Sequence, residues 1–213
     1  MDLTKLKFYY EHVLSQVYDE GHSEFHQALT TDVVEKFINP IALDKSACVV
    51  DVGCGPGYFL DLMSQKGYNN LLGITLSDED IEICKQKQHQ VRKGDISFLP
   101  HEDESVDLLF SRHSLEHSPF PYITLIEYNR VLKPNAHMYV EVPAPDGQRD
   151  HENNLNHYSI LGITMWLSLL KRTGFDVSWY KYQAPFTSKI TQETNVDDYY
   201  IFVCRRRFSM DVK

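Results

Sequence analysis

Two short stretches of the sequence combine histidines with carboxylates, the residue types that move protons or bind metal ions. The first is His113-Ser114-Leu115-Glu116-His117, and the second contains His151, Glu152 and His157. An imidazole titrates near neutral pH and can act as a general base. Imidazole and carboxylate groups together also form coordination shells for divalent cations. Both roles are therefore open for these side chains.

The first stretch also has the form H-x-x-E-H, which occurs in some zinc peptidases. That motif requires a helix, because only a helix places both imidazoles on one face. Here the stretch follows a predicted strand, and Pro119 and Pro121 come soon after it. The sequence therefore argues against zinc proteolysis.

A glycine-rich turn is the second feature that could do chemistry. Val49–Val52 are β-branched residues around a single acid, Asp51, and they are followed by Gly53, Gly55 and Gly57 and then by an amphipathic segment. We predict a buried strand, a turn and a helix, in which the glycines permit positive φ and the close approach of a ligand. The N-terminus of the helix can accept a negative group. The spacing G-x-G-x-G differs from the G-x-G-x-x-G of dinucleotide-binding proteins.

The elements that must position these residues alternate between strands and helices. Helical spacing predicts helices at residues 3–18 and 23–37, with a break at Gly21, and further helices after the glycine turn and at 78–87, 121–131 and 158–173. The acids in the first turn of the helix at 78–87 suit its dipole. Strands are predicted at 49–52, 70–75, 91–95, 106–111, 136–142, 175–182 and 198–205.

This order predicts an α/β fold, a Rossmann-like, seven-stranded and mostly parallel sheet with helices on both faces. The last two predicted strands are joined without a helix, so we expect a long hairpin and an antiparallel last strand. Residues 1–40 are predicted to form a helical cap over the ligand cleft, and residues 41–213 the Rossmann-like domain. In the cap, Tyr9, Tyr10, Tyr18 and His26 are candidates for ligand contact.

Composition narrows the class of partner. The chain has 213 residues and a formal net charge of -9, which argues against a sequence-independent grip on nucleic acid and favours a small molecule or saccharide. None of its four cysteines forms a C-x-x-C pair, and no apolar run reaches the length of a membrane span. We expect a cytoplasmic protein without a membrane partner. Its oligomeric state is not indicated.

Several blocks in their order resemble class I S-adenosylmethionine-dependent methyltransferases, in particular the small-molecule branch described as methyltransferase type 11. The glycine turn with Asp51 resembles the first motif of that family. Further matching blocks lie at 72–77, 94–100, 106–117 and 127–134, with a weaker one at 173–175. The resemblance covers about residues 45–145 and implies transfer of a methyl group from S-adenosylmethionine. It implies an acceptor that is a small molecule or saccharide, methylated at oxygen.

The resemblance also implies roles for individual residues. The methionine end of the cofactor is expected at Asp51 and the turn, the adenine at Asp95 and Ile96, and the sulfonium side near Arg112. The full expected cofactor set is Asp51, Gly53, Cys54, Gly55, Gly57, Tyr58, Thr75, Leu76, Asp95, Ile96 and Arg112. The expected catalytic residues are His113, His117 and His157, of which at least one acts as the base.

Three points qualify this assignment. The family usually has an acid that binds the ribose hydroxyls where this chain has Thr75, although Thr75-Leu76-Ser77 resembles the cyclopropane fatty acid synthase branch. A cofactor-binding protein without transferase activity is therefore the alternative. Some ubiquinone-pathway methyltransferases resemble the segment at Glu116 and His117 and hold a divalent cation there, so a metal is a second open question. The polar residues at 153–159 suggest a hydroxyl-rich acceptor.

Overall fold

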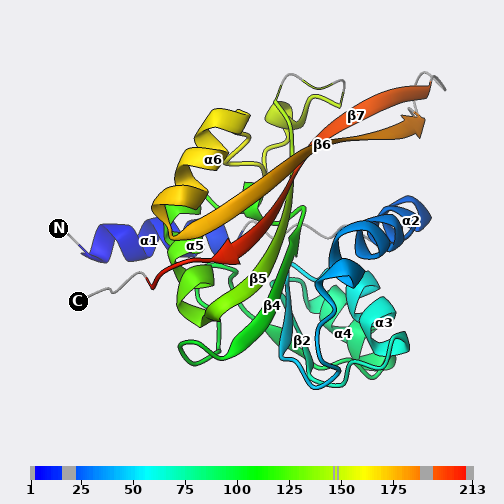
Figure 1. Cartoon of the computed structure of the whole chain (residues 1–213). Helices are drawn as coiled ribbons and strands as arrows, with labels where there is room; N and C mark the ends of the chain where they lie inside the picture. Colours follow the sequence, from blue (N-terminus) through cyan, green and yellow to red (C-terminus); the bar gives the residue numbers. More distant parts are fainter. Residues whose placement is uncertain (1–2, 16–22, 146, 148, 188–193, 210–213) are drawn as a thin grey trace.

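The chain folds around one mixed sheet (Figure 1). The computed structural model describes residues 3–15, 23–145, 147, 149–187 and 194–209. In these residues the strand order is β3-β2-β1-β4-β5-β7-β6. The strands are β1 (Val49–Val52), β2 (Leu71–Thr75), β3 (Val91–Lys93), β4 (Val106–Arg112), β5 (Leu132–Pro143), β6 (Phe175–Thr187) and β7 (Thr194–Arg206).

Strand β7 runs antiparallel to its neighbours. It pairs antiparallel with both β5 and β6, whereas the pairs from β3 across to β5 are parallel. The predicted Rossmann-like sheet with an antiparallel last strand is therefore confirmed. The carboxyl ends of β1, β2 and β4 lie at one edge of such a sheet, where ligands bind in folds of this kind.

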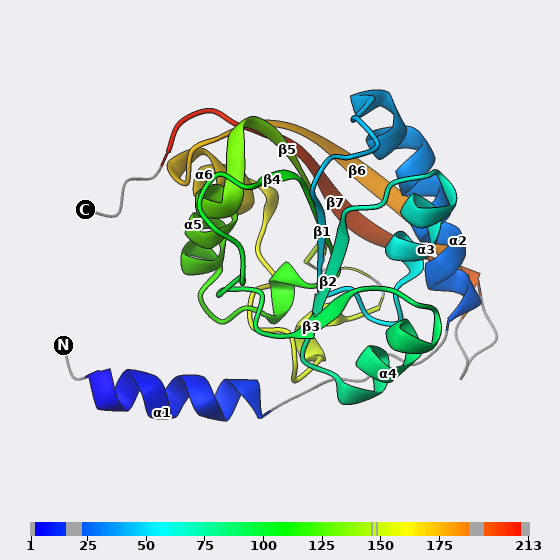
Figure 2. The ribbon, with the colours of Figure 1, turned by 90° about the horizontal axis from the view of Figure 1, so that it is seen from below.

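Helices cover both faces of the sheet. Figure 2 shows α5 and α6 on one side and α2 and α3 on the other. The helices are α1 (Leu3–Leu14), α2 (Glu24–Val33), α3 (Tyr58–Gln65), α4 (Asp78–Gln86), α5 (Pro121–Val131) and α6 (Ile163–Arg172). Short turns of other helix types are η1 (Val34–Ile38), η2 (Asn39–Ile41), η3 (Leu115–His117) and η4 (His151–Asn153). Among the described residues no helix has the length and apolarity needed to cross a bilayer.

Each face of the sheet has its own hydrophobic cluster. On one face Trp166 of α6 and Tyr128 of α5 are buried with the strands. On the other face Val33, Val34 and Phe59 pack together, and the rings of Phe59 and Phe110 stack with centroids 3.8 Å apart. Val33 and Val34 belong to the predicted N-terminal cap, so the second part of that cap shares a core with the sheet.

Three helix boundaries differ from the prediction. The helix predicted at 158–173 begins at Ile163, because the backbone N–H groups of Tyr158 and Ser159 donate instead to the carbonyl of Glu116, at 2.9 and 3.0 Å. The helix predicted at 23–37 changes from α to π geometry at Val34. The first helix ends at Leu14 and Ser15 forms a turn, while residues 16–18 of its predicted span and the break at Gly21 lie outside the described residues.

Candidate functional site

The glycine turn has the positive φ values that its sequence predicts. They are 75° at Gly53, 49° at Gly55 and 85° at Gly57, and α3 begins directly after Gly57. A Cβ on Gly53 would lie 2.3 Å from Cβ of Ser114, and one on Gly57 would lie 3.0 Å from Sγ of Cys84. Gly55 has nothing within 4 Å of that position. Gly55 is thus the glycine of the turn that faces open space, and the other two allow close packing.

A cavity of about 150 Å³ opens beside this turn, and we call it the glycine-turn cavity. Its lining draws on the ends of β1, β2 and β4 and on the loop after β3. Seven predicted cofactor residues line it: Gly53, Gly55, Thr75, Leu76, Asp95, Ile96 and Arg112. The sequence blocks that resemble separate cofactor motifs are therefore brought to one cavity.

Four predicted cofactor residues do not line that cavity. Asp51 lies inside β1 and is 3% exposed, and burial raises its pKa well above the usual range. Cys54 and Tyr58 are buried, and the Tyr58 hydroxyl accepts a hydrogen bond from the backbone of Ser23. The space that a Cβ on Gly57 would need is occupied by the side chains of Cys84 and His89. These four residues therefore contribute to the packing of the turn and not to the lining of the cavity.

Asp80 is a lining residue that sequence reasoning missed. It lies in the first turn of α4, is 4% exposed and borders the same cavity as Thr75. Ser77 caps this helix by accepting from the backbone N–H of Asp80, and Thr75 Oγ1 accepts from the N–H of Ser77. The only sequence signal was the acidic first turn, which was assigned to the helix dipole.

The candidates for ligand contact in the N-terminal segment lie in different places. Leu14 of α1 lines the glycine-turn cavity, and the ring of Tyr10 meets Phe98 edge-on, with centroids 5.3 Å apart. His26 of α2 lines a different cavity. Tyr18 and the side chain of Tyr9 lie outside the described residues.

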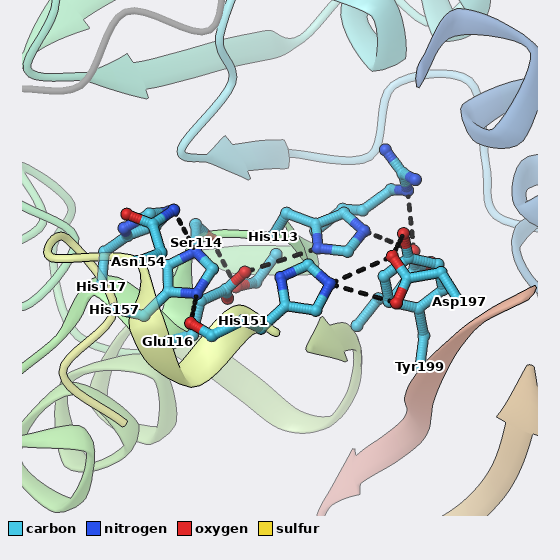
Figure 3. Close-up of polar contacts among 12 residues, drawn as sticks. His113, Ser114, Glu116, His117, His151, Asn154, His157, Asp197 and Tyr199 are labelled. Atoms are coloured by element: carbon cyan, nitrogen blue, oxygen red, sulfur yellow. Dashed lines mark hydrogen bonds and ion pairs between the residues drawn. The ribbon is translucent and has the colours of Figure 1, made fainter. Parts of the chain in front are cut away.

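A second cavity, of about 90 Å³, adjoins the first, and we call it the histidine cavity (Figure 3). His113 and His117 line both cavities. The two histidine-containing stretches of the sequence meet here, since the rings of His117 and His157 lie with centroids 4.9 Å apart. The lining consists of His26, His113, Glu116, His117, Arg149, His151, Asn154 and His157.

His113 is held between two carboxylates. Its Nε2 lies 3.0 Å from Oε1 of Glu141, and its Nδ1 lies 3.4 Å from Oε1 of Glu116. Burial and the Arg112 guanidinium lower the pKa of His113, but the two carboxylates outweigh them and raise it to about 9. His113 is consequently a cation at neutral pH and has no lone pair with which to accept a proton.

His157 has both ring nitrogens engaged. Oδ1 of Asn154 accepts from the backbone N–H of Asn156, which fixes the orientation of that amide. Its Nδ2 therefore donates to Nε2 of His157, at 3.2 Å, and Nδ1 of His157 donates to the carbonyl of His151, at 2.8 Å. Burial lowers the pKa of His157 and favours this neutral form.

His117 is oriented in the same way, by a backbone carbonyl at Nδ1. Its Nδ1 lies 2.9 Å from the carbonyl of Asn156, an acceptor, so Nδ1 carries the hydrogen. The lone pair of a neutral His117 is then on Nε2. Of the three predicted catalytic histidines, His113 and His117 line both cavities.

A buried network supports the far side of the histidine cavity. The carboxylate of Asp197, on β7, lies 3.0 Å from Nε2 of His151 and accepts from the hydroxyl of Tyr199. Arg149 lies 3.4 Å from the same carboxylate. Sequence reasoning missed Asp197, Tyr199 and Glu141, because they belong to strands β5 and β7, whose place beside η4 follows only from the sheet order.

The structure also bears on the metal hypotheses. Residues 115–117 form a single 3₁₀ turn, so the helix that a zinc-peptidase motif requires is missing from this described segment. One ligand atom each of Glu116, His117 and His157 lies within 4.8 Å of the others, which is a spacing compatible with a divalent cation.

Comparison with known proteins agrees with this geometry. A family described as "Methyltransferase domain" matches residues 50–140. Malonyl-[acyl-carrier protein] O-methyltransferase of Hamiltonella defensa is 35% identical over 42% of this chain and 35% of its own length, and the chain spans about a third of the first curated relatives that it matches. Demethylmenaquinone methyltransferase of Lactobacillus johnsonii is 25% identical over 77% of this chain and 70% of its own.

Among solved structures, the fold is similar to that of an S-adenosylmethionine-dependent methyltransferase from Archaeoglobus fulgidus. The TM-score is 0.68 at 19% identity, covering 86% of this chain and 96% of that one. At this identity the likeness concerns the fold, and the residues of the site must be argued from their own geometry.

Proposed function

We propose that the chain is a class I S-adenosylmethionine-dependent methyltransferase and that it transfers the methyl group of that cofactor to an oxygen atom of a small molecule or saccharide. The observation that carries the proposal is the pair of adjoining cavities, which share His113 and His117. A methyl donor in one cavity and an acceptor in the other would meet at these two residues. Positioning of this kind contributes much of the rate of group transfer.

The glycine-turn cavity fits the cofactor. Gly55 leaves open space beside a helix N-terminus, and Asp95 and Ile96 line the same cavity. Arg112 has a buried Nη2 without a hydrogen-bond partner among the described residues, so a polar ligand group would satisfy it. We assign the ribose hydroxyls to the carboxylate of Asp80, which borders Thr75, and so to an acid supplied by α4 in place of the usual one.

His117 is the base in this proposal, because it lines both cavities and its neutral form, with the hydrogen on Nδ1, carries its lone pair on Nε2. A bound acceptor hydroxyl would give its proton to Nε2 as the oxygen attacks the methyl group, and His113 would remain a fixed cation beside the reaction. His157 and Asn154 position His117 and do not take the proton. Residues 1–40 would cover the cofactor through Leu14, which lines its cavity. The exclusion of nucleic acid and the placement in the cytoplasm remain predictions from the sequence.

A divalent cation is the alternative ligand of Glu116, His117 and His157. The spacing of their ligand atoms favours it. The contact from Asn154 to Nε2 of His157 opposes it, since that lone pair already accepts a hydrogen bond. We therefore assign these residues to the acceptor. A stoichiometric metal in elemental analysis of the purified protein, together with loss of activity in EDTA, would contradict the assignment.

The function is tested in two steps. Calorimetry with S-adenosylhomocysteine should show binding, and its absence at millimolar concentration would refute the proposal. Incubation with cofactor that carries a labelled methyl group, in a metabolite extract, should then label an acceptor. Binding without any labelled acceptor would instead support a cofactor-binding protein without transferase activity.

A further inference from the structure

Glu116 has one carboxylate oxygen that the protein leaves unsatisfied. The side chain is 1% exposed, Oε1 pairs with His113, and Oε2 has no hydrogen-bond partner among the residues that the structure describes. Burial raises the pKa of Glu116, but the contact with His113 and the charges nearby outweigh it and lower it, so the group is ionised. Because an unpaired buried oxygen is costly, a ligand in this cavity should donate a hydrogen bond to it.

The charges around the histidine cavity are already matched. Arg112 and His113 contact Glu141, His113 also contacts Glu116, and Arg149 contacts Asp197. Three cations thus face three carboxylates. An anionic ligand group would meet the unpaired oxygen of Glu116 and would have to compete for cations that carboxylates already contact. A neutral hydrogen-bond donor is neither repelled by Glu116 nor in competition with the carboxylates for these cations.

The rest of the lining is polar. No apolar side chain lines the histidine cavity in the described part of the chain. His26 has a buried Nδ1 that no described residue pairs with, and burial, with the charges of His113 and Arg112, lowers its pKa to about 3. A neutral imidazole exchanges hydrogen bonds with hydroxyl groups, whereas an alkyl chain would leave it unsatisfied.

We infer that the acceptor is an uncharged polyhydroxylated compound, of the saccharide or alditol class, that donates one hydroxyl to Oε2 of Glu116 and bonds a second to His26. This inference rests on the proposed function and narrows it. The cavity volume of about 90 Å³ suits the polar end of such a compound, a few hydroxyl-bearing carbons, more than a whole large molecule. The hydroxyl to be methylated then lies at the border of the two cavities, beside His117.

The test is a transfer assay with labelled cofactor against three classes of compound. The first holds glucose, mannitol and inositol, the second glucuronate and malonate, and the third an apolar phenol and a quinol. Glucose and glucuronate differ by one carboxylate, so they form a matched pair. We expect label in the first class. Label that enters only the acids or only the apolar compounds would overturn the inference while supporting methyl transfer, and failure to bind S-adenosylhomocysteine would refute the function itself.

Variants locate the effect at the cavity. Glu116→Gln replaces the acceptor Oε2 by a donor, and we expect a fall of roughly 10- to 100-fold in kcat/KM for the polyhydroxylated acceptor, mainly through KM. Affinity for S-adenosylhomocysteine, which reports a folded cofactor site, should be retained. His26→Phe should lower the same ratio without removing a charge. Glu102→Gln, at an exposed acid, is the matched control. Unchanged KM in both cavity variants would overturn the inference.

Discussion

Nε2 of His113 lies 3.0 Å from Oε1 of Glu141, and this contact connects the residue that follows β4 to a buried carboxylate of β5. His113 has a φ of 50°, which turns the chain out of the strand at that point. Its ring is also bordered by Arg112, Glu116, His26 and Tyr199. The ion pair between His113 and Glu141 therefore contributes to the stability of the fold.

The first prediction concerns stability against pH. The folded-state pKa of His113 is about 9, above its ordinary 6.5. The proton therefore stabilises the fold fully below pH 6.5, and this contribution is lost as the pH rises through 9, on the order of 3 kcal/mol in total. Urea unfolding of the wild type and of His113→Gln between pH 6 and 10 measures it. Parallel curves for the two proteins would contradict it.

The second prediction separates two histidines. His117→Gln should lower kcat by roughly 10²- to 10⁴-fold, because it removes the base, while affinity for S-adenosylhomocysteine is kept. His157→Gln should cost less, because Nε2 of His157 already accepts from Asn154. The limb of the pH–rate profile that reports the base should persist in the His157 variant and vanish in the other. Persistence of that limb in His117→Gln would show that another group is the base.

The third prediction tests Asp80 as the ribose acid. Asp80→Asn should weaken S-adenosylhomocysteine binding about tenfold, because a hydrogen bond to a carboxylate is stronger than one to a neutral amide. Asp78→Asn is the matched control. Asp78 is in the same helical turn but is exposed and pairs with Lys93 at 2.7 Å, away from the cavity. Calorimetry measures the affinity of both variants for S-adenosylhomocysteine. Equal affinities would show that Asp80 does not bind the cofactor.

The sequence was informative where local patterns determine structure. Alternating segments predicted the sheet and its antiparallel strand, and the glycine spacing predicted positive φ at Gly53, Gly55 and Gly57. The start of α6 was predicted too early, because the N–H groups of Tyr158 and Ser159 donate to the carbonyl of Glu116. These partners are 42 and 43 residues apart in the sequence, so no local pattern indicates the contact.

The site was harder to predict where it depends on long-range neighbours. Asp197 reaches the histidines because β7 inserts beside β5, and Glu141 reaches them because β5 pairs with β4. Whether a histidine carries a proton depends on the same neighbours. The sequence offered His113, His117 and His157 as equivalent candidates, and only Glu141 beside one and Asn154 beside another distinguish them.

The last prediction concerns the packing under the glycine turn. Gly53→Ala adds a Cβ that would lie 2.3 Å from Cβ of Ser114, at a φ of 75°. Gly67→Ala has a similar φ of 87° but nothing within 4 Å, so it isolates backbone strain, about 1–2 kcal/mol. We expect Gly53→Ala to destabilise the protein by more than this, because the steric contact adds to the strain.

A double variant shows whether Ser114 is the cause. Ser114→Gly alone should destabilise the protein, because Oγ of Ser114 donates to the carbonyl of Val52. Combined with Gly53→Ala it should cost less than the sum of the two single changes, with a coupling of about 0.5–3 kcal/mol, because the added Cβ then has room. Denaturant unfolding of the four proteins completes the cycle. Simple additivity would mean that β1 and the η3 turn do not meet at these two residues.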